Sequence, residues 1–358
     1  MSLLFEPLTL RSLALRNRVW LAPMCQYSAV DGVPNDWHLV HLGARATGGF
    51  GLVFTEASAV TPEGRISPQD AGIWNDQQAA AWRRVVDFVH GQGTPIGVQL
   101  AHAGRKASTY RPWAPEHGTV PVSDGGWTAV APSPVAFEGY AEPTPLTLPE
   151  LAEVVTSFAD AARRAVATGF DTVEVHAAHG YLLHQFLSPL SNRRDDAYGG
   201  SFDNRIRLLL ETVDAVRAAI PDGMPLVVRI SGTDWIDGGW DVEQSTRLGR
   251  HLREHGVDLV DVSSGGNARA SIPLGPGYQV PLSADVRRGA DIPTGAVGLI
   301  TEPAQAEKVL ANGEADVVLL ARAALREPAW PLRAAHELGV PADDAGWPDQ
   351  YKRGVWRA

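Results

Sequence analysis

Alternation of short apolar segments with helical patterns predicts that this chain folds as one α/β domain, a (β/α)₈ TIM barrel. Eight segments have the nearly continuous apolar character of parallel strands that are buried on both faces. The length of 358 residues suits a single barrel with additions to its loops. The predicted strands are residues 19–22, 52–55, 95–100, 171–175, 225–230, 257–262, 295–300 and 315–321.

Helical spacing of apolar residues follows most of these strands. The helix expected at 147–168 has a capping-box pattern in Thr147 and Glu150, and Gly169 ends it. The segment after the sixth strand has the weakest pattern, which predicts a helix of only 283–288. The other predicted helices are residues 36–48, 76–90, 203–219, 242–255 and 302–312.

One connection is much longer than a barrel needs. Residues 102–146, after the third strand, are rich in Gly, Pro, Trp and Ser and show little periodicity. Connections of this length are more often functional lids than linkers, and this one follows the carboxyl end of a strand, where barrels build their sites. We therefore expect one domain, residues 1–358, with a lid at 102–146.

Composition excludes several classes of function. Lys and Arg number 31 against 41 Asp and Glu, a net charge of −10, which argues against nucleic acid or an anionic membrane as the main partner. The only cysteine, Cys25, excludes a disulfide within the chain and leaves an iron–sulfur cluster without ligands. We see no signal peptide and no segment long enough to span a bilayer, so we expect a cytoplasmic protein.

Polar residues follow the ends of the predicted strands. His176, His179 and Tyr181 come directly after the fourth strand, and Arg229 ends the fifth. The loops after strands seven and eight, which contain Arg322, form the usual phosphate site of such barrels. Because all strand ends meet at one face of a barrel, we expect these side chains to lie close together.

Three interpretations of the histidine pair are open. A metal site needs a third and usually a fourth ligand, and Glu174 is the one carboxylate nearby. Alternatively, His176 and His179 are structural residues whose hydrogen bonds neighbours satisfy. In the third interpretation, two imidazoles donate to one carbonyl oxygen and Tyr181 supplies a proton. This last interpretation accounts for all three residue types.

At this point several long motifs, in order along nearly the whole chain, resemble one family. The segment "HAAHGYLLHQFLSPLSNRRDDAYGGSFDNRIRLLLE" (176–211) resembles the central signature of the Old Yellow Enzyme family of flavin-dependent ene-reductases. Cys25, Tyr27 and the His/His pair are similar to its thermophilic-like subgroup. The segment "LFEPLTLRSLALRNRVWLAPMCQY" resembles its N-terminal cap and first strand, and further matching segments are "TEASAVTPEGR", "VQLAHAGRKA", "PTGAVGLIT" and "QYKRG".

The resemblance implies non-covalent FMN at the carboxyl-terminal mouth of the barrel. Arg229 would lie near the N1/C2 carbonyl region of the flavin, where positive charge favours the reduced, anionic form. Ala321 stands where the family usually has glycine before the phosphate-binding arginine. The implied FMN-binding residues, which would surround the ring system and the phosphate, are Pro23, Met24, Cys25, Ala57, Gln99, Arg229, Gly298, Ala321 and Arg322.

The implied activity is that of an NAD(P)H:enone oxidoreductase with ping-pong kinetics. NADPH or NADH reduces FMN, and an α,β-unsaturated carbonyl compound then receives a hydride from flavin N5. His176 and His179 would bind the carbonyl oxygen, Tyr181 would protonate the α-carbon, and Tyr27 would contact the substrate. The resemblance also implies no metal.

The family resemblance further implies an assembly, a homodimer or a homotetramer built from dimers. Residues 345–358 are rich in aromatic residues and arginine, and they would lie at a subunit interface. Arg353, or alternatively Trp356, would reach the active site of the neighbouring subunit. A frayed terminus is the other interpretation of this segment.

Rival functions make different demands on the sequence. A flavin-free lyase or isomerase for phosphorylated sugars needs a Schiff-base lysine or paired carboxylates at strand ends, which we do not find. A flavin-binding redox sensor would use Cys25, although a small buried apolar residue is the other interpretation of that cysteine. Relatives that carry an iron–sulfur cluster are excluded by the single cysteine.

Overall fold

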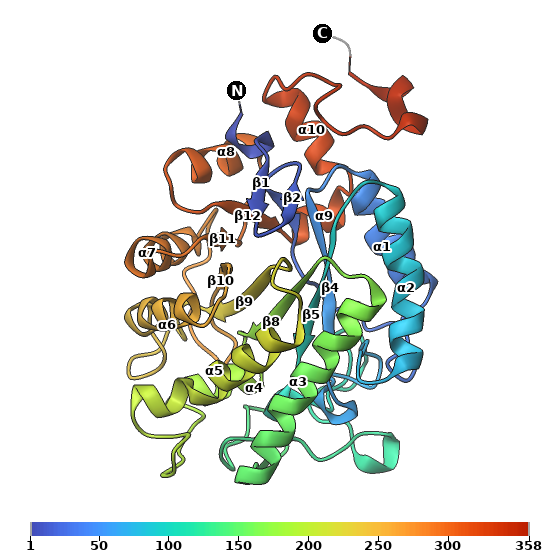
Figure 1. Ribbon diagram of the computed structural model, residues 1–358. Helices are drawn as coiled ribbons and strands as arrows, with labels where there is room; N and C mark the ends of the chain where they lie inside the picture. The colour runs from blue at the N-terminus through green and yellow to red at the C-terminus, as the bar shows by residue number, and fades with distance from the viewer. Residues whose placement is uncertain (1, 357–358) are drawn as a thin grey trace.

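The computed structural model describes residues 2–356, and its centre is a closed barrel of parallel strands (Figure 1). Backbone pairing of Val318 with Val19 joins the last strand to the first and closes the barrel. All eight predicted strands are present close to their predicted positions. They are β3 (Val19–Leu21), β4 (Leu52–Ala59), β5 (Ile96–Ala101), β8 (Thr172–Ala177), β9 (Leu226–Ser231), β10 (Leu259–Ser263), β11 (Thr294–Ala296) and β12 (Val317–Leu320).

Helices surround this barrel and cover its strands (Figure 1). The predicted helices are confirmed as α1 (Asp36–Thr47), α2 (Asp76–Gly91), α3 (Leu148–Thr168), α5 (Phe202–Ala219), α6 (Val242–Glu254), α7 (Val280–Ala290) and α8 (Pro303–Ala311). Three shorter helices, which the sequence analysis did not predict, are α4 (Leu182–Leu187), α9 (Arg322–Arg326) and α10 (Trp330–Glu337).

Helix α3 illustrates how local sequence sets these limits. The Glu150 carboxylate accepts the backbone N–H of Thr147 at 2.7 Å, which completes the predicted capping box. Gly169 ends the helix with a φ of 101°, a left-handed conformation that favours glycine. Between them, Leu151 and Phe158 are fully buried on the face that packs against the barrel. The helix is therefore amphipathic with a defined start and stop.

Two predicted limits were wrong. Helix α7 covers Val280–Ala290 rather than 283–288, because Val280, Leu282 and Val286 form a buried stripe that begins before the predicted start. Strand β11 ends at Ala296 rather than at residue 300. Gly298 and Leu299 have φ values of 122° and 52°, which an extended strand does not allow. The segment after β11 is consequently a loop at the mouth of the barrel.

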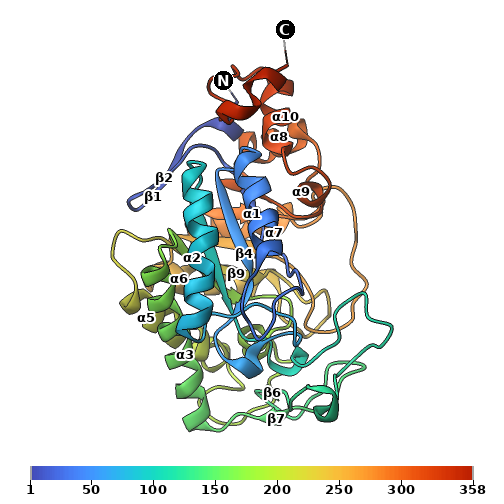
Figure 2. The same cartoon turned by 90° about the vertical axis from the view of Figure 1, so that its right-hand side faces the viewer.

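The amino-terminal end of the barrel is closed by a hairpin of β1 (Leu8–Leu10) and β2 (Leu13–Leu15). Leu10 and Leu15 belong to an apolar cluster that includes Trp20, Leu259 and Val317 of the barrel strands. The first and last segments that the structure describes lie toward this side of the molecule (Figures 1 and 2). This apolar cluster fills the base of the barrel.

The opposite end of the barrel carries residues 102–146. This segment contains two short strands, β6 (Val130–Ala131) and β7 (Thr144–Pro145), which pair with each other. Figure 2 shows β6 and β7 at the end of the molecule farthest from the two termini. The long connection thus lies over the carboxyl ends of the strands.

The carboxyl-terminal segment forms the 3₁₀ helix Asp349–Gly354 and packs beside α10. The Trp356 ring stacks on His336, with 5.1 Å between ring centroids, and lies edge-on to Trp347. Among residues 2–356, no helix has the length and apolar character needed to cross a membrane.

Candidate functional site

The histidine pair lies at the end of β8 and in the loop that follows it. His176 is paired in register with Arg229 of β9. The ring centroids of His176 and His179 are 5.3 Å apart, and those of His176 and Tyr181 are 5.1 Å apart. The three side chains that the sequence singled out therefore form one cluster at the mouth of the barrel.

Hydrogen bonds fix how each imidazole is presented. The backbone N–H of Ala178 donates to Nδ1 of His176 at 3.3 Å, so Nε2 of this ring carries the hydrogen. Nε2 of His179 lies 2.7 Å from Oγ of Ser263, a shorter contact than the 3.4 Å between that hydroxyl and Gln279. Oε1 of Gln279 already accepts the Ser264 hydroxyl at 2.6 Å, so we assign the Ser263 hydroxyl as donor to His179, which places the ring hydrogen on Nδ1. Nε2–H of His176 and Nδ1–H of His179 take no part in these two contacts, so each ring has one N–H to offer a ligand.

Both imidazoles are neutral in this environment. Burial lowers the pKa of His176 and of His179 well below the usual value, and the nearby Arg229 guanidinium lowers each pKa further. A neutral imidazole donates one hydrogen bond, and unlike an imidazolium it does not readily give up that proton to an anion. The pair is therefore suited to stabilising negative charge on an oxygen.

Tyr181 and Tyr27 belong to a small cluster that also contains Cys25. Burial raises the pKa of the Tyr181 phenol well above its usual value, and the Cys25 side chain adds to this effect. Burial likewise raises the pKa of the Cys25 thiol. The phenol of Tyr181 therefore keeps its proton until a strongly basic atom forms beside it, and Cys25 is not a thiolate.

A polar layer lies inside the barrel beneath this cluster. Gln99 Nε2 donates to Glu174 Oε1 at 2.6 Å, and Arg229 Nε lies 2.9 Å from Asp261 Oδ2. All four side chains are almost completely buried. Burial raises the pKa of Glu174 to about 8, so this carboxyl holds a proton at neutral pH. Asp261 alone then balances the charge of Arg229.

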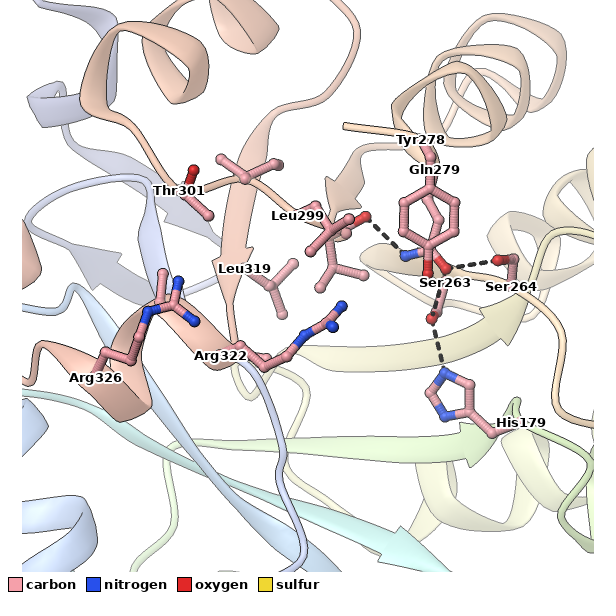
Figure 3. Close-up of a pocket in the computed structure, with 15 residues that line it drawn as sticks. His179, Ser263, Ser264, Tyr278, Gln279, Leu299, Thr301, Leu319, Arg322 and Arg326 are labelled. Carbon is pink, nitrogen blue, oxygen red and sulfur yellow. Dashed lines mark hydrogen bonds between the residues drawn. The ribbon is translucent and has the colours of Figure 1, made fainter. Parts of the chain in front are cut away.

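A cavity of about 290 Å³ opens between the loops after β10, β11 and β12 (Figure 3). Arg322, the first residue of α9, extends into this space, and His179 borders it on the other side (Figure 3). A Cβ on Gly298 would lie 2.6 Å from the side chain of Gln279, so only glycine fits there. Ala321 precedes α9 without a side-chain cap, which leaves the first amides of the helix for an anion.

These residues fit an FMN molecule. The cavity offers a phosphate the Arg322 side chain, the backbone at Gly298 and the first amides of α9, and His179 borders it on the other side. Ala57 of β4 is paired in register with Gln99, so both lie at the same level of the barrel. Pro23, Met24 and Cys25 follow β3 directly, at the same end.

A second cavity of about 430 Å³ lies under the lid. It is bordered by Tyr27 and Tyr181 and by three cationic side chains, those of Lys106, Arg111 and Arg269. The Lys106 ammonium donates to two backbone carbonyls, of His179 at 2.8 Å and of Gly266 at 2.9 Å. These two hydrogen bonds tie Lys106 to the loops after β8 and β10.

Two predicted site residues do not join this cluster. Arg353 and Trp356 lie in the carboxyl-terminal segment, beside α10 and toward the opposite end of the molecule from the lid (Figures 1 and 2). They do not border either cavity of their own chain. Within residues 2–356, no group of three His, Cys, Asp or Glu side chains is arranged to hold a metal ion.

Sequence analysis missed several residues that shape the site. Ser263 and Gln279 hold His179, and the hydroxyl of Ser231 accepts the backbone N–H of His179 at 2.9 Å. Their signal in the sequence was weak because serine and glutamine are common in loops. His184 was visible as a third histidine in "HAAHGYLLH", but nothing local indicated its partner.

The comparison with protein families decides the class of protein. The model of the NADH:flavin oxidoreductase / NADH oxidase family matches residues 3–340. The chain belongs to this family. The expected kinship with the Old Yellow Enzymes is thereby confirmed, and the protein is a flavin-dependent oxidoreductase with FMN as cofactor and NADH or NADPH as reductant.

Individual relatives agree with this assignment. An NADPH dehydrogenase of Geobacillus thermodenitrificans is 48% identical over 359 residues, covering 99% of this chain and 99% of its own. An NADPH dehydrogenase of Listeria innocua is 45% identical over 360 residues, with 100% of both chains covered. The solved structure of morphinone reductase is 29% identical, with a TM-score of 0.80 over 97% of this chain and 96% of the other.

Proposed function

We propose that this flavoenzyme reduces the activated C=C bond of α,β-unsaturated carbonyl compounds. The observation that carries the proposal is the cluster of two neutral imidazoles and one protonated phenol beside the lid cavity. One N–H from each of His176 and His179 would bind the carbonyl oxygen and stabilise the negative charge that grows there. This differential binding lowers the barrier to reduction.

Tyr181 has the chemistry of the proton donor. Its phenol keeps the proton because the surroundings are apolar, and it lies within 5.1 Å of the His176 ring, centroid to centroid. When bound, FMN supplies the hydride that adds to the β-carbon of the alkene. Tyr181 would then transfer its phenolic proton to the α-carbon, which becomes basic as the charge develops.

The polar layer beneath the cluster suits the flavin ring. Gln99 and Ala57 would contact its polar edge, and Arg229 would lie near the N1/C2 carbonyl region. Asp261 holds the guanidinium from the barrel side, so the arginine keeps its position and charge. Pro23, Met24 and Cys25 would line the ring system.

The lid cavity suits the substrate and the reductant in turn. Tyr27 would contact the small molecule on the face of the cavity shared with Tyr181. Arg111 would give the outer rim a positive charge for the phosphates of a reduced nicotinamide dinucleotide, whereas Arg269 is paired with Glu138 of the same cavity at 3.3 Å. Successive use of one cavity by two ligands gives ping-pong kinetics.

The tail supports an assembly of at least two chains. Arg353 and Trp356 lie away from the barrel mouth of their own chain. They would therefore complete the site of a second copy, in a homodimer or in a homotetramer built from dimers. Exposed apolar side chains of Trp37, Val40 and Tyr351 offer surface for such an interface.

An absorption titration tests the proposal. The purified holoenzyme is mixed anaerobically with a para-substituted phenol, and the expected result is a broad long-wavelength charge-transfer band from a phenolate stacked on the flavin. The variant His176→Ala is expected to weaken phenol binding and to reduce enone turnover by about 10²- to 10³-fold, the cost of one oxyanion donor. FMN retention should change far less.

The control for this titration is His90→Ala, since His90 lies at the carboxyl end of α2 and away from the cavities. A flavin spectrum without a charge-transfer band would count against the oxygen-binding role of the pair. Equal loss of FMN and of phenol in His176→Ala would show that the histidine serves the cofactor instead.

A further inference from the structure

The turn that carries His179 has an unusual backbone. His179 has a φ of 58° and Gly180 a φ of 71°, so two consecutive residues adopt the left-handed conformation. A non-glycine residue rarely adopts this conformation unless its surroundings hold it there. A Cβ on Gly180 would lie 2.2 Å from the carbonyl oxygen of Gly266, which excludes any larger residue.

A buried histidine of α4 holds this turn. His184 Nδ1 accepts the backbone N–H of Gly180 at 2.9 Å, and its Nε2 lies 3.2 Å from Oδ1 of Asp234. The side chains of His184 and Asp234 are both 0% exposed. Because Nδ1 accepts a hydrogen bond, it is unprotonated, and the ring hydrogen lies on Nε2, toward the carboxylate.

Asp234 is itself fixed. Its Oδ2 accepts the hydroxyl of Ser188 at 2.6 Å and the backbone N–H of Trp240 at 2.9 Å. Burial alone would raise the pKa of Asp234, but the His184 ring and these donors lower it below its usual value. The Ser188 and Trp240 donors fix this carboxylate, and its Oδ1 lies beside His184 Nε2 as a close ion-pair contact rather than a well-aligned hydrogen bond.

We propose that Asp234 and His184 are positioning residues for the carbonyl-binding pair. They hold Gly180 N–H, which keeps His179 in its left-handed conformation and directs its imidazole toward the same point as that of His176. This inference rests on the proposed function of the two histidines. Neither His184 nor Asp234 borders the two cavities, so they act through the turn and not through substrate or cofactor.

Lys106 holds the other side of the same turn. Its ammonium donates to the carbonyl oxygens of His179 and Gly266, which ties the loop after β8 to the loop after β10. The His179 carbonyl and the Gly180 N–H belong to one trans peptide and point in opposite directions, so Lys106 and His184 hold this peptide from its two sides. Loss of either contact lets the His179 imidazole move, and displacement by about 1 Å is enough to cost about 10²-fold in such a site.

The test compares two variants at His184 with one at Asp234. His184→Leu removes the acceptor for Gly180 N–H, and His184→Asn keeps an acceptor near the place of Nδ1. Asp234→Asn keeps the shape but removes the charge. We expect His184→Leu to raise the dissociation constant for the phenol by about tenfold to a hundredfold while the FMN dissociation constant changes by less than about threefold.

His184→Asn should recover most of the phenol affinity, because asparagine can still accept the hydrogen bond from Gly180 N–H although its side chain is smaller than that of histidine. Faster hydrogen–deuterium exchange in the peptide that contains Gly180 should accompany the loss in His184→Leu. If His184→Leu does not fold, Asp234→Asn gives the same comparison, with a smaller rise in the phenol dissociation constant.

The control is His90→Leu. His90 Nε2 lies 2.7 Å from Asp171, a pair of the same chemistry at the amino-terminal end of β8. This variant should bind phenol like the wild type. Unchanged phenol affinity in folded His184→Leu and Asp234→Asn overturns the inference, as does equal loss of phenol and FMN. Absence of the phenol band in the wild type would instead overturn the proposed function.

Discussion

The two ends of the barrel use similar polar residues in different ways. At the amino-terminal end, Asp258 precedes β10, accepts the backbone N–H of Leu226 at 2.8 Å and pairs with Arg11 at 2.6 Å. The carboxylate joins two neighbouring strands to a cation. The same arrangement recurs at Asp171, with Ile96 and His90, and at Asp316, with Thr294 and Arg287.

At the mouth, polar groups are buried without a complete set of partners. Asp261 lies on β10, the strand that Asp258 precedes. Among residues 2–356 only Arg229 pairs with it, and not through a well-aligned hydrogen bond. Oε2 of Glu174 is buried and has no hydrogen-bond donor within residues 2–356. His179 has the left-handed backbone described above.

This difference between the two ends indicates that the amino-terminal end serves stability and the mouth serves chemistry. Satisfied carboxylates at the base fix the register of the strands and contribute to folding. Buried and strained groups at the mouth cost folding free energy, and they persist where a ligand or a reaction uses them. Substitution of matched residues at the two ends tests this division.

The largest effect is expected for Tyr181→Phe. Removal of the proton donor should slow the enone half-reaction by about 10²- to 10⁴-fold, because general acid catalysis contributes that much. Reduction of the flavin by NAD(P)H needs no proton from this phenol, so its rate should remain. Stopped-flow measurement of each half-reaction separates the two.

The matched control for this change is Tyr198→Phe, whose hydroxyl donates to Glu211 at 3.0 Å outside both cavities. It should leave both half-reactions unchanged. Equal slowing of both half-reactions by Tyr181→Phe would assign that residue to the flavin rather than to the substrate.

A smaller effect distinguishes the two arginine–aspartate pairs. Arg229→Met leaves Asp261 buried without its cation, which should lower the free energy of unfolding by about 3–5 kcal/mol. Arg11→Met should cost about 1 kcal/mol or less, because the pair is partly exposed. Denaturant unfolding of the FMN-free proteins measures both, and similar losses would remove the distinction between the ends.

The last effect concerns the pH dependence of stability. Glu174 has a pKa of about 8 in the fold against a usual 4.5, so between these values the folded chain holds a proton that the unfolded chain has released. The free energy of unfolding therefore falls as pH rises from about 4.5 to about 8. Glu174→Gln should reduce this slope, as measured by urea unfolding across that range.

Glu153→Gln, an exposed change on α3, provides the control and should keep the wild-type slope. A Glu174→Gln variant with the full wild-type slope would show that this carboxyl is ionised in the fold. That result would also leave the polar layer with an excess negative charge beside Arg229.

Local sequence determined most of the architecture. Apolar segments specified the eight strands, and the capping box at Thr147 and the stop at Gly169 specified α3, because these signals act between residues close in the chain. The predicted limit of β11 was wrong because the conformation of the loop after it, with left-handed Gly298 and Leu299, depends on packing against other loops. That of α7 was wrong because the buried stripe of this helix begins at Val280, before the predicted start.

For the site, the sequence by itself determined that His176, His179 and Tyr181, the side chains proposed to carry the chemistry, come from one short segment. Only the tertiary structure decided how they are held. His184 and Asp234 are 50 positions apart along the chain, and Lys106 reaches His179 from 73 positions away. No local pattern encodes such pairs, since closure of the barrel alone brings the loops after different strands into contact.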